Sequence, residues 1–228
     1  EAVSVVSELQ KFHNIDFKKL PKDLKKIIKP KSRGSGFDYI KKSVSGYLTI
    51  KVLPLDAKNN KKELLHKVLE RRLGVTDFKN KITSLLQRLE PKVENDSNRG
   101  VYIVHGDMAA NNLYVFDDGE VEFLDLEWVS LFKNKVVAMV YDFGNIRARS
   151  WKNKLFRDGL DQALLELYKS NGQEELGKVI VCLSILRSNI HFSKYFENYP
   201  WDKQKKEEET ERRTIVEGEI TKIWDFNF

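Results

Sequence analysis

The sequence has a single cysteine, only two methionines and no long hydrophobic run. One thiol, Cys182, cannot form an intramolecular disulfide. No apolar stretch approaches the roughly 20 residues that a membrane-spanning helix needs, and none resembles the apolar core of a secretory leader. These absences argue against a disulfide-stapled scaffold and against a membrane partner. They predict a reducing, cytoplasmic setting.

The chain also lacks a strong charge of one sign. Lys and Arg number 40 against 34 Asp and Glu in 228 residues, which gives a formal net charge of +6. Because basic and acidic residues alternate along the chain, the excess indicates a solvated surface, and nucleic acid is not the expected partner. A hydrophobic content of 41% is enough for a packed core and excludes a disordered chain. The length predicts one globular domain, or two small ones.

Apolar residues at helical spacing predict most of the secondary structure. The helices are expected over about residues 2–13, from Lys61 to a glycine cap at Gly74, from Thr76 or Asp77 to Pro91, and along three apolar stripes after residue 150. The segment 30–56 is interrupted by glycine and proline. It is predicted to be loop-rich, with one short strand over residues 47–52.

Three short apolar runs in the middle of the chain predict strands, over residues 101–104, 113–116 and 121–126. Asp118-Gly119, between the second and third runs, is a strong signal for a β-hairpin with a two-residue turn. That register places Asn112 directly across from Asp125, with both side chains on one face. An amide oxygen and a carboxylate that converge in this way predict a magnesium site.

Asp107 lies five residues before Asn112, on the loop that leads into this hairpin. The spacing Asp-x-x-x-x-Asn, followed by a second Asp after a hairpin, is the arrangement that phosphoryl transfer uses. One carboxylate accepts the proton of the attacking hydroxyl, while the Asn and the later Asp hold metal on the phosphates. Asp107 is therefore the candidate base, and Asn112 and Asp125 are the candidate ligands for magnesium and nucleotide.

Two segments, HGDMAANN (105–112) and FLDLEW (123–128), resemble the catalytic and metal-binding segments of the aminoglycoside phosphotransferase and choline kinase family. The resemblance implies an ATP- and magnesium-dependent small-molecule kinase with a protein-kinase-like fold. It implies Asp107 as catalytic base, Asn112 and Asp125 as magnesium ligands, and His105 as a support of the catalytic loop. Asp142 is similar to a structural Asp that heads the next helix, and Glu127 matches an acidic position of less certain role.

The expected fold class is helix-rich α+β, a kinase-like C-terminal lobe over residues 1–228 whose small hairpin carries the metal ligands. A complete kinase also needs an N-terminal lobe that clamps the triphosphate. Gly34-Ser35-Gly36 and Lys51, with Glu63 or Glu70, imitate a glycine loop and its strand lysine. Too few residues remain before His105 for the rest of such a lobe, so the lobe is expected to be absent from this chain.

The expected activity is transfer of the γ-phosphate of ATP to a hydroxyl of a small molecule, weak or absent from this lobe alone. The expected partners are a nucleoside triphosphate, a hydroxylated substrate and the missing lobe. An aminoglycoside would need carboxylates, for which residues 197, 202 and 207–209 are candidates; choline would need an aromatic cage, for which Tyr195, Tyr199 and Trp201 are candidates. Alternatives are an inactive kinase-derived binding module and an atypical protein kinase.

Other side chains that could carry chemistry have simpler structural interpretations. His13 is expected on a helix face, and Cys182 as an inert core thiol. Trp128 is expected to pack. Arg147 and Arg149 are expected on a solvated helix face, with contact to substrate or phosphate as the alternative.

Overall fold

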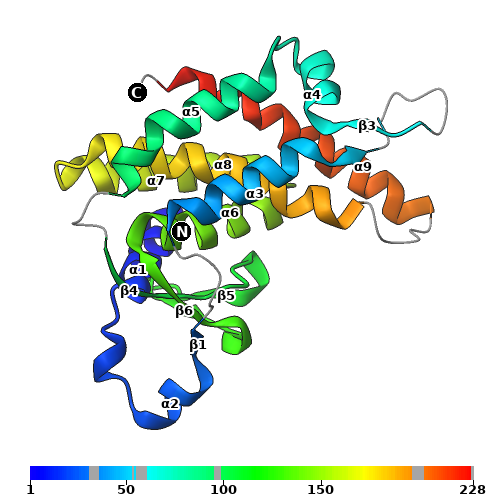
Figure 1. Cartoon of the computed structure of the whole chain (residues 1–228). Coiled ribbons are helices and arrows are strands. Elements are labelled where there is room, and N and C mark those ends of the chain that lie inside the picture. The colour runs from blue at the N-terminus through cyan, green and yellow to red at the C-terminus, as the bar shows by residue number, and fades with distance from the viewer. Residues whose placement is uncertain (31–35, 53, 55–60, 95–98, 197–202, 227–228) are drawn as a thin grey trace.

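The computed structural model describes the chain except residues 31–35, 53, 55–60, 95–98, 197–202 and 227–228. A layer of long helices lies over a smaller region of short strands, and a short N-terminal arm projects beyond the strands (Figure 1). The helix-rich α+β class expected from the sequence is confirmed.

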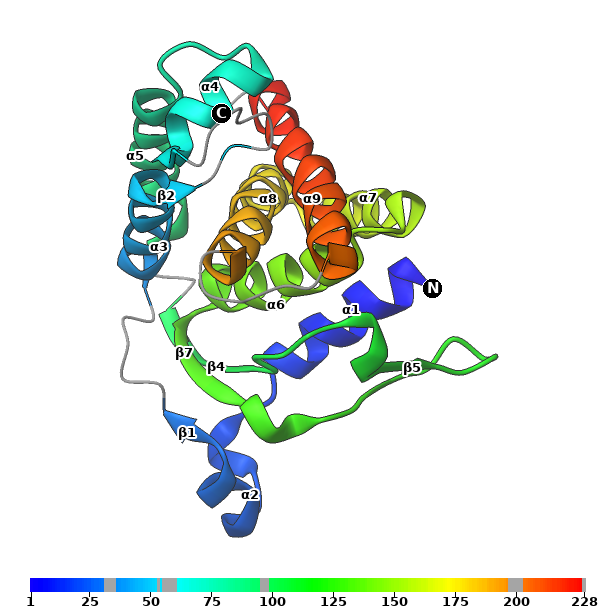
Figure 2. The same ribbon diagram turned by 90° about the vertical axis from the view of Figure 1, so that its right-hand side faces the viewer.

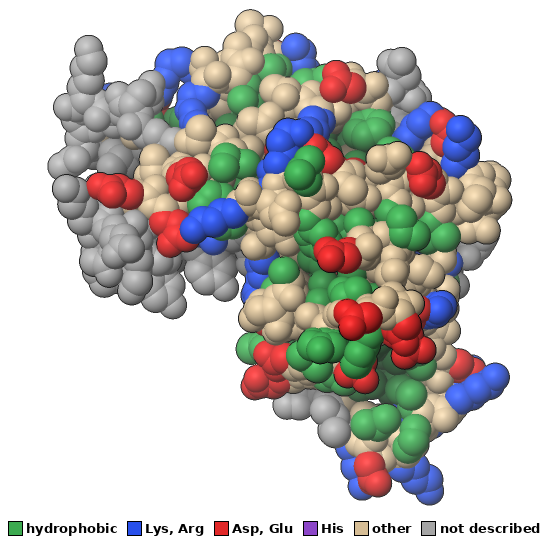
Figure 3. Space-filling model, turned by 180° about the vertical axis from the view of Figure 1, so that it is seen from behind, with side chains coloured by type: hydrophobic (Ala, Val, Ile, Leu, Met, Phe, Trp, Pro, Cys, Tyr) green, Lys and Arg blue, Asp and Glu red, His purple; other side chains and the backbone are tan. Residues whose placement is uncertain are grey.

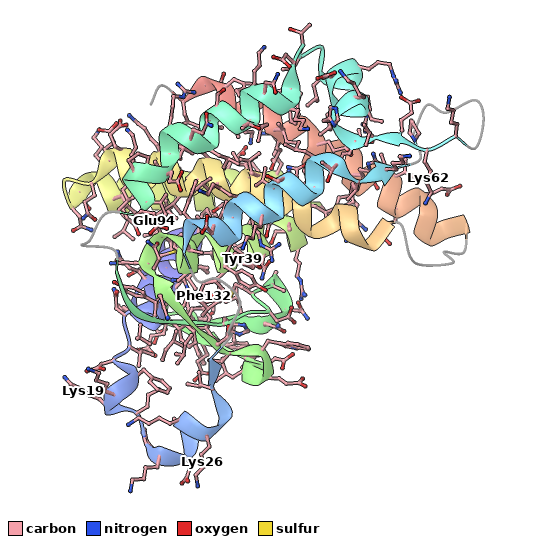
Figure 4. The ribbon with its side chains drawn as sticks, in the orientation of Figure 1. Lys19, Lys26, Tyr39, Lys62, Glu94 and Phe132 are labelled. Carbon is pink, nitrogen blue, oxygen red and sulfur yellow. The ribbon has the colours of Figure 1, made fainter. Side chains whose placement is uncertain are left out.

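Helix α1 (Ala2–His13) lies between the strand region and the helical layer (Figure 2). It buries Val5, Val6 and Leu9 on one face, as its apolar spacing predicts. The arm follows, with a 3-10 turn η1 (Phe17–Lys19) and a short helix α2 (Lys22–Ile27). Lys19 and Lys26 point away from the body of the molecule (Figure 4).

The prediction of a loop-rich segment before residue 56 is wrong for most of its described part. Helix α3 (Phe37–Thr49) occupies it and includes the first half of the expected strand 47–52. Its buried residues recur at helical spacing: Phe37, Ile40, Val44, Tyr47 and Leu48. A Cβ added at Gly46 would meet nothing within 4 Å, so this glycine only lowers helix propensity and does not break the helix.

The next two helices are present as predicted, but the first begins at Leu65 instead of Lys61 and the second ends later than expected. Strands β2 (Lys51–Val52) and β3 (Glu63–Leu64) pair before α4 (Leu65–Leu73), which ends at Gly74 in the left-handed conformation, with φ +64°. Helix α5 (Phe78–Val93) begins after Asp77 but continues past Pro91. Proline removes only one backbone donor in the last turn, so the helix ends two residues later than expected.

The strand region contains a mixed sheet and a separate hairpin. Strand β7 (Ser130–Asn134) lies between β1 (Lys29–Pro30), which is parallel to it, and β4 (Arg99–Val104), which is antiparallel. Strands β5 (Leu113–Val115) and β6 (Val121–Phe123) form the hairpin. Tyr39 of α3 meets Phe132 of β7 edge-on, with ring centroids 6.0 Å apart (Figure 4), which joins the strands to the helical layer.

The remaining helices form most of the core. They are α6 (Lys135–Arg149), α7 (Lys154–Ser170), α8 (Glu174–Phe196), α9 (Lys203–Gly218) and the 3-10 segment η5 (Glu219–Asp225). Helix α6 packs against α8 on one side and against β4 on the other. It is therefore the element that connects the core to the strands. Among the described helices, none is long and apolar enough to span a membrane.

Candidate active site

The carboxylate of Asp142 holds the start of the loop that follows β4. One oxygen of Asp142 accepts the backbone N–H of His105 (2.8 Å), and the other accepts that of Gly106 (2.9 Å). His13, at the end of α1, adds a third contact through Nε2 at 2.9 Å. Asp142 and His13 are fully buried, so these contacts form in a low-dielectric interior. They fix the start of the loop relative to both α1 and α6.

Two sequence interpretations change here. Asp142 lies inside α6 and does not head that helix, although its contacts fit the structural role expected for it. His13 does lie at the end of a helix, but on its buried face, where its ring bonds to this carboxylate.

The ring of His105 links the loop to the hairpin. Its Nε2 lies 2.8 Å from the carbonyl oxygen of Leu124, which can only accept, so Nε2 carries the proton. The other ring nitrogen, Nδ1, then accepts the backbone N–H of Asp107 at 3.3 Å. One imidazole thus joins Asp107, two residues later in the loop, to Leu124, the residue before Asp125.

Gly106 allows the loop to lie against the segment after the hairpin. Its φ is +87°, and a Cβ at this position would lie 2.3 Å from the carbonyl oxygen of Trp128. No side chain fits this approach, and an L-residue is also strained at such a φ. The glycine between His105 and Asp107 is therefore required by the geometry.

Asp107 and Asn112 lie in the same loop and are joined directly. The side-chain Nδ2 of Asn112 donates to the backbone carbonyl of Asp107 at 2.8 Å. Asn112 ends the 3-10 turn η3 (Ala110–Asn112) and is buried, whereas the Asp107 side chain is about a quarter exposed. The hydrogen bond directs the amide nitrogen toward the loop, which leaves Oδ1 as the atom available to a cation.

The hairpin register differs from the prediction by one residue. The turn is a three-residue loop, because Phe116 N–H donates to the Glu120 carbonyl and Gly119 N–H donates back to Phe116, both at 2.9 Å. Gly119 has φ +87°, as a glycine following a type I turn commonly does. Asn112 consequently lies across from Leu124, and its backbone carbonyl accepts the N–H of Leu124 at 2.9 Å. Asp125 is one residue farther along the chain. The prediction that Asn112 and Asp125 face each other directly is wrong.

Asp125 leaves the strand in a left-handed conformation, with φ +55°, so strand alternation does not set its direction. It precedes the 3-10 turn η4 (Leu126–Trp128) and is exposed, as is Glu127 within that turn. Trp128 is 55% exposed, so the expectation that it packs in the interior is wrong. Acidic and apolar side chains lie mixed on the surface of the strand region when the molecule is viewed from behind (Figure 3).

The donor set of the site fits magnesium chemically. An amide oxygen from Asn112 and an exposed carboxylate from Asp125 are hard ligands. Asn112 directly precedes β5 and Asp125 follows β6 by two residues, so both lie at the open end of the hairpin. Among the residues that the structure describes, no three His, Cys, Asp or Glu side chains gather to hold a metal by themselves. A metal here would therefore take its other ligands from water and phosphate, as magnesium commonly does.

The two arginines at the end of α6 do not share one solvated face. Arg147 is buried and bonds to Asp161 and Glu219, which ties α6 to α7 and η5. Arg149 donates from Nη2 to Oδ1 of Asp107. Sequence periodicity did not reveal this second contact, because only the packing of α6 under the loop brings residues 107 and 149 together.

The segment that imitates a glycine loop and its strand lysine is described only in part. Gly34 and Ser35 lie outside the described residues, and Gly36 precedes α3. Lys51 lies in the two-residue strand β2, paired with β3. Of the substrate candidates, residues 197–202 lie outside the described residues, whereas Glu207 and Glu208 are exposed on α9.

No family model and no curated protein matches the sequence. Among solved structures, the fold is similar to that of an ethanolamine kinase from Plasmodium vivax, with a TM-score of 0.50 and 13% sequence identity. The likeness covers 98% of this chain but 58% of that kinase, so the chain spans less than two thirds of the kinase's length. The chain has a kinase-like fold. A shared fold at this identity does not by itself assign an activity.

Proposed function

We propose that this chain is the catalytic lobe of a phosphotransferase that moves the γ-phosphate of ATP to a hydroxyl of a small molecule. The observation that carries the proposal is the braced loop. Asp107 and Asn112 are hydrogen-bonded within it, His105 links it to the residue before Asp125, and Asp142 fixes its start. A base and a metal ligand held in one hydrogen-bonded loop, and linked to the segment that carries the second ligand, are what positioning catalysis requires.

In the proposed reaction, Asp107 accepts the proton of the substrate hydroxyl while the hydroxyl oxygen attacks the γ-phosphorus. The bond between that phosphorus and the bridging oxygen breaks, and ADP leaves with the electron pair. Asn112 and Asp125 would hold magnesium, which supplies neutralisation of phosphate charge. The chain's own contribution is to hold the carboxylate of Asp107 in a fixed and partly exposed position, where the substrate hydroxyl can reach it.

A second lobe would complete the nucleotide site. The likeness to a kinase that this chain covers only in part supports this partner. In the described residues the sequence candidate for a phosphate-clamping lysine, Lys51, lies in strand β2 on the helical side of the molecule (Figure 2). We therefore expect weak or no turnover from the 228 residues alone, and full activity only when the lobe that clamps the triphosphate is supplied.

The test is release of ADP from MgATP by the chain expressed with any coding sequence that precedes it, against a panel of hydroxylated metabolites. The Asp107→Asn variant keeps the shape of the side chain but removes the base, so turnover should fall at least about a hundredfold. Asp158→Asn, a surface carboxylate of α7, is the matched control and should keep its activity. Equal turnover in wild type and Asp107→Asn would contradict the proposal.

Binding of nucleotide separates the proposal from an inactive binding module. We expect MgATP to raise the melting temperature of wild type, and Asp125→Asn to remove most of that rise. Labelled phosphate found on added proteins rather than on small molecules would favour an atypical protein kinase.

A further inference from the structure

A cavity of about 440 Å³ is lined in part by Arg149, whose guanidinium is bonded to the candidate base Asp107. The end of α6 and the residues after it form one wall, with Arg149, Trp151 and Lys152, and the hairpin strand β5 forms another, with Leu113 and Val115. A molecule bound to Arg149 in this cavity is therefore separated from the proposed proton acceptor by one guanidinium group. If Asp107 is the base, this cavity is where the accepting alcohol binds.

The groups in this cavity that could recognise a cation are already engaged. The ammonium of Lys152 lies 5.0 Å from the centroid of the Trp151 ring and 2.7 Å from a carboxylate oxygen of Glu208. An aromatic face and a carboxylate are the usual binding partners of an ammonium ligand. The remaining carboxylate at the cavity, Glu1, is exposed, where water and salt screen its charge.

Arg149 presents the opposite chemistry. Its side chain is about a third exposed, and Nη2 donates to Asp107. Among the described residues, no other acceptor is recorded for its guanidinium. A guanidinium has five N–H donors in a planar fork, so the others can bind a carboxylate or a phosphate.

We propose that the alcohol accepted in this cavity carries a negatively charged group, a carboxylate or a phosphate ester, which binds Arg149. Since this guanidinium also holds Asp107, the anionic group lies within a few bonds of the hydroxyl that receives the phosphate. The substrate class then differs from the amino alcohol that the name of the ethanolamine kinase indicates. The binding of the anionic alcohol does not depend on the proposed function. Only its phosphorylation after binding rests on that proposal.

Binding is tested first, without nucleotide, by calorimetric titration at low salt with four small probes. Glycerate and glycerol 3-phosphate are the two anionic alcohols, glycerol is the neutral one, and ethanolamine is the cationic one. We expect at least one anionic probe to bind tenfold or more tightly than glycerol or ethanolamine. Tighter binding of ethanolamine, or no preference for either anion, would overturn the inference. Which anion binds better shows whether the site takes a carboxylate or a phosphate.

Variants then assign the preference to one residue. Arg149→Gln should reduce the preference for the anionic probe at least tenfold, and Arg149→Lys should retain part of it, since a lysine keeps the charge but not the fork. Lys154→Gln removes the same charge from an exposed residue outside the cavity wall and should change the affinity less than twofold. An unchanged preference in Arg149→Gln would contradict the assignment.

Turnover separates this inference from the proposed function. With MgATP, release of ADP on addition of ethanolamine but not of an anionic probe would uphold the kinase proposal and overturn the anionic substrate. Arg149-dependent binding of glycerate without release of ADP by the chain and its second lobe would uphold the anion site and contradict the kinase proposal.

Discussion

The two halves of the candidate site are held in different ways. The loop half, from His105 to Asn112, is hydrogen-bonded to the fully buried carboxylate of Asp142 on α6, which His13 of α1 also contacts. The ring of His105 joins the loop to Leu124, the residue after β6. The hairpin half, with Asp125 and Glu127, is exposed and is supported by strands of three residues each. The proposed base and one proposed metal ligand, Asn112, thus lie in the buried, hydrogen-bonded loop, whereas the other proposed ligand, Asp125, is open to solvent.

This contrast has a physical reason. A base must be correctly placed before the substrate arrives, because a misplacement of about 1 Å costs much of its effect. A magnesium ligand works together with water and phosphate oxygens, which complete the coordination only when the nucleotide is bound. The loop half therefore gains from burial, whereas the hairpin half needs access. The contrast predicts large stability effects in the first half and small ones in the second.

The largest loss of stability is expected from Asp142→Ala. The change leaves two backbone N–H groups and the His13 ring without their shared acceptor, so the free energy of unfolding should fall by about 3–5 kcal/mol. Urea unfolding measures it. Asp142→Asn keeps one acceptor oxygen and should lose less. A loss below about 1 kcal/mol for the alanine variant would mean that the loop is not braced by this carboxylate.

Gly106→Ala should be nearly as damaging. The new Cβ would collide with the carbonyl oxygen of Trp128, and φ +87° is unfavourable for alanine, so the loss should be about 3 kcal/mol. Gly119→Ala in the hairpin is the matched control. Its φ is also +87°, but the nearest atom, Ser4 Oγ, is 3.5 Å away, so only the strain of about 1–2 kcal/mol remains. Equal losses in the two variants would remove the contrast.

Asp125→Asn should leave stability almost unchanged, within about 0.5 kcal/mol, because the side chain is exposed. The affinity for magnesium should nevertheless fall about tenfold or more, since a charged ligand becomes neutral. Titration of MgATP binding measures the change. Glu122→Gln, an exposed residue of β6, removes the same charge and serves as the control. A similar loss of affinity in both variants would point to general electrostatics rather than to ligation by Asp125.

The smallest change is expected in the reactivity of Cys182 on α8. Burial raises the pKa of this thiol to about 12, so at pH 8 it stays protonated in the native protein and should not react with a thiol reagent. Labelling should require unfolding, and Asp125→Asn should not accelerate it. Labelling should be faster in Asp142→Ala, whose α6 packs against α8. Rapid labelling of the native wild type would show that this core opens.

Secondary structure can be predicted from the sequence where residues close together in the chain determine it. The helices α1 and α4, the left-handed glycine at Gly74 and the hairpin around Gly119 follow from residue spacing and glycine's conformational freedom. Segment 37–49 differs because Gly46, and the glycines and prolines on either side of the segment, predict a loop. The same pattern of apolar residues is compatible with a helix once a core exists to bury it.

The sequence by itself determined which chemical groups are present and their order: a candidate base, an amide five residues later, and an acid beyond a turn. Tertiary structure alone decided the hairpin register, the burial of His13 and Asp142 as a pair, and the contact of Arg149 with Asp107. The physical reason is distance along the chain. Partners separated by 42 or 129 residues meet only when helices pack, and a register depends on hydrogen bonds that close across a turn.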